Sequence, residues 1–116
     1  MVELNGESGQ ITSPGYPNQY ENLLKCQYRI TVGPNDIIRI DFEEFDTERH
    51  NDLVELFDGD SENATSLGKL SGHSNPQSIH TSSNHLFVKL ISDRTVSYRG
   101  FKLNYTRVKD KGKCLN

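Results

Sequence analysis

Short runs of alternating apolar and polar residues recur along the chain, separated by glycine, proline, asparagine, aspartate and serine. No segment shows the spacing of three to four residues that marks an amphipathic helix. Alternation with a period of two is typical of strands that bury one face and expose the other. The pattern predicts strands at residues 10–12, 27–31, 37–45, 53–57, 66–70, 77–81, 85–91 and 100–107.

The alternation also assigns the faces of the longer strands. Their apolar faces are formed by Ile38, Ile40 and Phe42, by Leu86, Val88 and Leu90, and by Phe101, Leu103 and Tyr105. Eight short strands at this spacing favour an all-β fold, a sandwich of two antiparallel sheets.

Length and composition indicate one domain with one core. The chain has 116 residues, of which 33% are hydrophobic. Residues 1–108 are predicted to form the domain, and the lysine-rich residues 109–116 a linker or tail. A net charge of -3 argues against a nucleic-acid binder, because no cluster of Lys and Arg is present to neutralise phosphates. No apolar run approaches the roughly 18 to 20 residues that cross a bilayer, so membrane insertion is not expected.

The segment 41–60, DFEEFDTERHNDLVELFDGD, is unusually acidic: nine of its twenty residues are Asp or Glu. Neighbouring like charges repel and cost stability. A cationic partner or ion would offset this cost. Asp41, Glu43 and Glu55 alternate with apolar residues, so we interpret them as the solvent face of strands.

Two sequence features bear on the cellular compartment. Cys26 and Cys114 are even in number but form no CxxC or similar metal motif. The sequons at Asn63 and Asn104, each with Thr two residues later, are candidate N-glycosylation sites and favour the secretory route.

Four segments, in order and at matching spacing, resemble one family. Residues 9–20 read GQITSPGYPNQY, residues 26–30 read CQYRI, residues 40–45 and 52–59 read IDFEEF and DLVELFDG, and Ser92-Asp93 is followed by Gly100-Phe101 and Tyr105. These segments resemble a CUB domain, with Tyr28 replacing the usual tryptophan of the second segment. The resemblance implies a jelly-roll β-sandwich and a secreted protein, or an extracellular part of a larger one.

The cysteines depart from the usual pattern of this family, which has four in two bridges. Only the second is kept, as Cys26, while residues 49–51 and Ser71 stand where the third and fourth would be. The first would precede Leu4, at or before Met1. Cys26 could therefore pair with Cys114, pair with an upstream cysteine, or be free, and Cys114 also permits a disulfide-linked dimer.

The resemblance also implies one Ca²⁺ site, as in a subset of CUB domains. Its carboxylates would be Glu48, Asp52 and Asp93, and the backbone carbonyls of Thr95 and, less strictly, Val96 would complete it with water. Ca²⁺ takes about six to eight oxygen ligands, which suits this set. Tyr20 would hydrogen-bond a ligating carboxylate and fix its angle.

The function implied by the resemblance is a non-catalytic module for protein–protein interaction. The ion would order the acidic loops, so that Tyr20, Glu48, Asp52 and Asp93 receive a Lys or Arg of a partner. The alternatives are a glycan-binding module, as in the spermadhesins, and a structural spacer without metal. An enzyme is not expected, because the sequence has no nucleophile elbow and its four histidines lack a zinc spacing.

Overall fold

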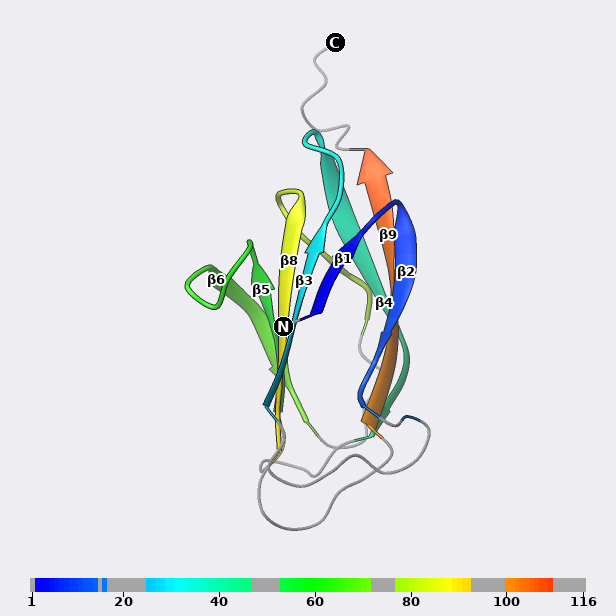
Figure 1. Ribbon diagram of the computed structural model, residues 1–116, viewed down its shortest axis with the longest axis vertical. Helices are drawn as coiled ribbons and strands as arrows, with labels where there is room; N and C mark the ends of the chain where they lie inside the picture. Colours follow the sequence, from blue (N-terminus) through cyan, green and yellow to red (C-terminus); the bar gives the residue numbers. More distant parts are fainter. Residues whose placement is uncertain are drawn as a thin grey trace.

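The computed structural model describes residues 2–14, 16, 25–46, 53–71, 77–92 and 100–109. Within these residues the chain forms two packed β-sheets and no helix (Figure 1). The five-stranded sheet has the order β1 (Val2–Asn5), β3 (Lys25–Thr31), β8 (His85–Ile91), β5 (Leu53–Asp58) and β6 (Thr65–Leu70). The four-stranded sheet has the order β2 (Ser8–Thr12), β9 (Gly100–Lys109), β4 (Asp36–Asp46) and β7 (Ile79–His80). The predicted all-β sandwich is confirmed.

All eight predicted strands are present, with bounds that differ by a few residues. β4 gains a residue at each end, β7 is reduced to two residues, and β9 continues to Lys109, the first residue of the predicted tail. β1 was not predicted, and it pairs with β3 in parallel, whereas the other described strand pairs are antiparallel. Gly6, with a φ of 124°, lies in the short link between β1 and β2, where the chain changes sheet.

The core lies between the two sheets and is built from the predicted inward faces. Phe101 is fully buried near its centre, stacked on Phe45 and edge-on to Tyr28, each at a centroid distance of 6.4 Å. Ile38, Ile40, Leu86, Val88, Leu90 and Leu103 are fully buried, and Phe42 packs against them while partly exposed. The face assignment from alternation is therefore confirmed.

One close approach in the four-stranded sheet requires a glycine. Gly9 on β2 lies directly opposite Tyr105 on β9, and the tyrosine ring covers it. A Cβ atom at Gly9 would lie 2.8 Å from Tyr105 Cε2 and 2.9 Å from its hydroxyl oxygen, closer than real contacts allow. Gly9, the first residue of the first CUB-like segment, thus makes room for an aromatic ring in the core.

The described part of the chain also contains no helix that is long and apolar enough to cross a membrane.

Candidate metal-binding end and outer surfaces

The residues predicted to hold calcium lie outside the described residues. This applies to Tyr20, Glu48, Asp52, Asp93, Thr95 and Val96. The strand ends to which they are attached are described, however. The placement of those ends decides whether the predicted ligands leave the sandwich at the same place.

Strand register brings these ends together at one end of the sandwich (Figure 1). Leu53, which follows Asp52, lies opposite Ile91, two residues before Asp93. Asp46, two residues before Glu48, lies opposite Gly100 in the other sheet. Residues directly opposite on antiparallel strands have Cα atoms about 4.5 to 5.5 Å apart. The strands that adjoin Asp52 and Asp93 in the sequence are therefore neighbours, and β4, which precedes Glu48, ends in the facing sheet at the same end.

The chemistry of the predicted donor set fits a hard cation. Three carboxylates and backbone carbonyls supply oxygen alone, the ligand type that Ca²⁺ prefers. Within the described residues, no group of three or more His, Cys, Asp or Glu side chains could hold a metal ion. The fit therefore rests on the type of donor and on the strand ends.

The acidic residues inside strands have other partners. Asn104 Nδ2 donates a hydrogen bond of 2.9 Å to Glu43, and Lys102 forms an ion pair of 3.0 Å with the same carboxylate. These contacts hold the pKa of Glu43 below its usual value, and the hydrogen bond from Asn104 has the largest effect. The Ser78 hydroxyl donates to Asp41 and, with Arg39, lowers the pKa of Asp41. The interpretation of these two residues as a solvent-facing strand surface is confirmed.

A second aromatic cluster lies on the outer face of the five-stranded sheet. Phe57 on β5 and Phe87 on β8 are directly opposite each other, and their ring centroids are 6.0 Å apart. Both point away from the sandwich core, yet they are only 6% and 2% exposed. Something other than the opposite sheet must therefore cover them.

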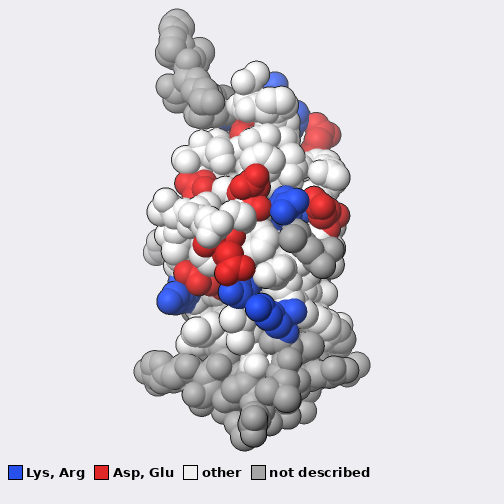
Figure 2. All heavy atoms as spheres, turned by 60° about the vertical axis from the view of Figure 1, so that its left-hand side comes forward, with Lys and Arg blue, Asp and Glu red and all other residues white. Residues whose placement is uncertain are grey.

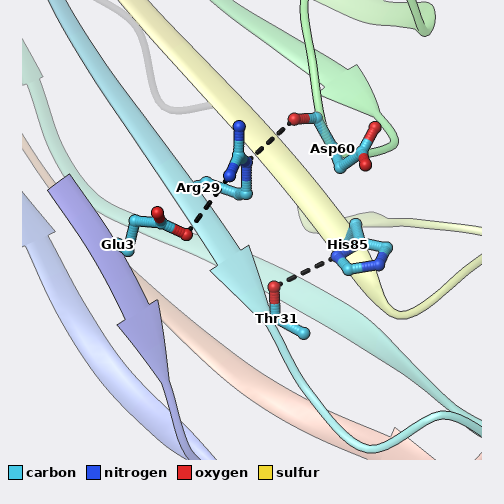
Figure 3. A network of polar contacts seen from close by, with 5 residues as sticks. All are labelled: Glu3, Arg29, Thr31, Asp60 and His85. Atoms are coloured by element: carbon cyan, nitrogen blue, oxygen red, sulfur yellow. Dashed lines mark hydrogen bonds and ion pairs between the residues drawn. The ribbon is translucent and has the colours of Figure 1, made fainter. Parts of the chain in front are cut away.

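The loop of residues 59–64, between β5 and β6, makes polar contacts on this outer face. Arg29 Nε of β3 donates a hydrogen bond of 3.0 Å to the backbone carbonyl of Asp60, which lies on the other side of β8, so this contact spans β8 (Figure 3). Glu62 then forms a 3.1 Å ion pair with Lys89 on β8. Phe87 lies between Arg29 and Phe57 in the register, so the contact between Arg29 and Asp60 spans the strand that carries Phe87. We call residues 59–64 the covering loop.

Charges of both signs are interspersed on the side of the molecule turned forward in Figure 2. Arg29 also forms an ion pair of 3.3 Å with Glu3 on the edge strand β1 (Figure 3). Such exposed pairs contribute up to about 1 kcal/mol each. This surface does not resemble a patch of one sign that attracts a highly charged partner.

The remaining predicted sites fall in different places. Cys26 on β3 is half-buried, packs against the core and forms no disulfide with another described residue. Cys114 lies outside the described residues, so their pairing stays a prediction. Burial raises the pKa of the Cys26 thiol. Asn63 is exposed on the covering loop, and Asn104 is half-buried in the middle of β9.

Comparison with known proteins assigns the family. The sequence model of the CUB domain matches residues 2–105. The chain belongs to the CUB domain family. It is 40% identical to human cubilin over 116 residues, covering 97% of this chain and 3% of cubilin. It is also 36% identical to human tolloid-like protein 1 over 113 residues, covering 94% of this chain and 11% of the relative.

Solved structures agree with the fold. The extracellular region of zebrafish Gpr126/Adgrg6 matches with a TM-score of 0.83 and 29% identity, covering 93% of this chain and 14% of that one. The MASP-1 CUB2 domain bound to Ca²⁺ matches with a TM-score of 0.81 and 28% identity, covering 90% of this chain and 96% of that one.

Family membership confirms two further predictions in general form. CUB domains occur in the extracellular regions of larger proteins, and this CUB domain spans only a small part of its relatives. The family consists of non-catalytic modules that mediate protein–protein interaction, although some whole proteins that contain them are proteases.

Proposed function

We propose that this CUB domain binds one Ca²⁺ ion at the end of the sandwich where β5 begins and β8 ends, and there receives a Lys or Arg side chain of a protein partner. The observation that carries the proposal is the register of Leu53 with Ile91 and of Asp46 with Gly100. This register brings together the strand ends next to the three predicted carboxylates in the sequence, which supports the proposal. The MASP-1 CUB2 domain, bound to Ca²⁺, supports the same use of the fold.

In this proposal Glu48, Asp52 and Asp93 supply carboxylate oxygens, and Thr95 and Val96 supply carbonyl oxygens. Bound Ca²⁺ would neutralise most of the repulsion among the carboxylates. Three carboxylates exceed the charge of one divalent ion, so the ordered end keeps a negative charge. Tyr20 would hold a carboxylate at a fixed angle by hydrogen bonding. A lysine ammonium or arginine guanidinium then meets acidic oxygens that are already in position.

Calcium binding is tested by calorimetry on chelator-treated protein. We expect one ion per chain and a higher melting temperature with calcium, because the ion binds the folded state. Asp93→Ala should lose both effects. Asp60→Asn is the matched control: it also removes one negative charge, but it lies on the covering loop, where Asp60 contacts Arg29 through its backbone carbonyl. No heat and no melting shift at millimolar calcium would contradict the site and favour the glycan-binding and spacer hypotheses.

Binding of a basic residue is tested with immobilised polylysine in calcium and in chelator. Nonspecific attraction would grow in chelator, because loss of Ca²⁺ makes the domain more negative. The proposal expects the opposite result, with binding lost in chelator and in Asp93→Ala but kept in Asp60→Asn. Binding that rises when calcium is removed would show that general charge, rather than an ordered site, attracts the cation.

A further inference from the structure

The two N-glycosylation sequons of the chain have contrasting structural settings. Asn63 lies on the covering loop, outside any strand, and its side chain is exposed. Its backbone N–H donates to the Ser61 hydroxyl at 3.2 Å, and the Ala64 N–H donates to the Ser61 carbonyl at 3.1 Å. Both contacts are donated by backbone N–H groups, so neither uses the side chain of Asn63. Among the described residues, none bonds to the Asn63 side-chain amide, the group that accepts a glycan.

Asn104 is held within a sheet. Its backbone lies on β9 between Gln10 of β2 and Asp41 of β4, so it is flanked by strands on both sides. Its side-chain nitrogen, Nδ2, donates the 2.9 Å hydrogen bond to Glu43. This nitrogen is the atom that would bond to the sugar. A glycan there would crowd the Glu43 contact and stand on the middle of the four-stranded sheet.

We propose that Asn63 is an N-glycosylation site of this domain and that Asn104 is left unmodified. In the reaction Asn63 Nδ2 loses one proton and forms a bond to the anomeric carbon of an oligosaccharide. The bond from that carbon to the pyrophosphate of a lipid-linked oligosaccharide donor breaks, and the lipid pyrophosphate leaves with the bonding electrons. Thr65, two residues after Asn63, completes the sequon and is exposed at the start of β6.

The position of Asn63 gives the glycan a structural consequence. The covering loop joins β5 to β6, and β6 is an edge strand of the five-stranded sheet. Edge strands present unpaired backbone groups that can pair with other chains. A glycan on this loop shields that edge and the adjoining outer face. The loop follows the end of β5, whereas the calcium site is proposed where β5 begins, so the glycan leaves that end open.

The test uses the full chain secreted from mammalian cells behind a cleavable signal peptide. We expect intact mass to show one N-glycan per chain, removable by an amidase specific for N-glycans. Release in heavy-oxygen water should label Asn63 as aspartate and leave Asn104 as asparagine. Asn63→Gln and, with the asparagine retained, Thr65→Ala should both abolish the mass increment. Asn104→Gln should keep it.

Site mapping on the unsubstituted chain keeps the proposal testable even where a variant folds poorly. An unmodified secreted chain, a label at Asn104, or a glycan that persists in Asn63→Gln would each overturn it. The readout is mass alone, so it is independent of calcium binding and of any partner.

Discussion

The backbone carbonyl of Asp60 accepts a hydrogen bond of 3.0 Å from Arg29 Nε, although β8 lies between β3, which carries Arg29, and β5, which Asp60 follows. This contact spans the strand that carries Phe87, which with Phe57 forms a small aromatic cluster outside the main core. Phe57 and Phe87 lie on an outward face, and their burial depends on a loop held by a few polar contacts. The cluster should therefore respond to loss of those contacts independently of the core.

Arg29→Ala should release the covering loop. The substitution removes the hydrogen bond to Asp60 and the ion pair with Glu3. We expect a loss of about 1.5 to 3 kcal/mol in the free energy of unfolding, the range for hydrogen bonds made by charged groups. Urea unfolding measures this loss, and hydrogen exchange should show faster exchange in residues 59–64. Lys25→Ala, an exposed basic residue on the same strand and face, is the control and should change neither.

Gly9→Ala should destabilise the domain because the added methyl group meets the Tyr105 ring at 2.8 Å. Overpacking of this kind costs about 1 to 3 kcal/mol. Thermal or urea unfolding gives the value. A smaller residue at Tyr105 should relieve the clash, so Gly9→Ala should cost less in a Tyr105→Leu background than in the native one. Equal costs in the two backgrounds would show that the ring is not the obstacle.

The alternation of apolar and polar residues predicted most of the fold, because neighbouring side chains of a strand point to opposite faces and only one face is buried. Ile38 and Ile40 are buried as their period of two requires. Phe87 also follows the alternation and points outward, yet it is buried, and the contacts that span its strand involve the covering loop, which is distant from it in the sequence. β1 has mostly exposed residues, and its pairing with β3 supplies what its own sequence does not indicate. The local pattern therefore predicts which face of a strand points inward, but not the burial or pairing that depends on segments distant in the sequence.

The candidate metal site was predicted by the family resemblance rather than by alternation. Asp52 and Asp93 are far apart in sequence, and acidic residues in polar segments are usually solvated. The register of Leu53 with Ile91 was not readable from either segment alone. The same limit applies to Glu43 and Asn104, whose contact depends on how β4 aligns with β9.

Acid should destabilise the domain in part through Glu43. Contacts from Asn104 and Lys102 lower its pKa in the folded state. A lowered carboxyl pKa gives stability that is present above the unfolded value, about 4.3 for Glu, and that is lost as pH falls through the folded value. The urea midpoint should therefore decline below about pH 4.3.

Asn104→Ala tests the cause of this shift, because it removes the largest contribution to it. The pKa of Glu43, followed by NMR of its side-chain carboxyl, should rise toward the usual value. Asn5→Ala, at an exposed asparagine on β1, is the matched control and should leave that pKa unchanged. An unchanged Glu43 pKa in Asn104→Ala would contradict the assigned cause.

Cys26 should react slowly as long as the domain is folded. Its side chain is half-buried against the core, and burial raises the pKa of its thiol. Only the thiolate is nucleophilic, so low access and a raised pKa both lower the reaction rate.

The test uses a Cys114→Ser variant that is treated with reductant, which is then removed. We expect the aromatic disulfide reagent DTNB to label the folded chain at least roughly tenfold more slowly than the urea-unfolded chain. Cys26→Ser provides the complementary variant, in which Cys114 is the single thiol. Equal rates for folded and unfolded Cys114→Ser would show that β3 does not protect Cys26.

The number of DTNB-reactive thiols in the unreduced native chain in denaturant distinguishes its cysteine states. Two thiols mean that both cysteines are free, and none means that both are oxidised. A nonreducing gel then separates a bridge within one chain from a disulfide-linked dimer.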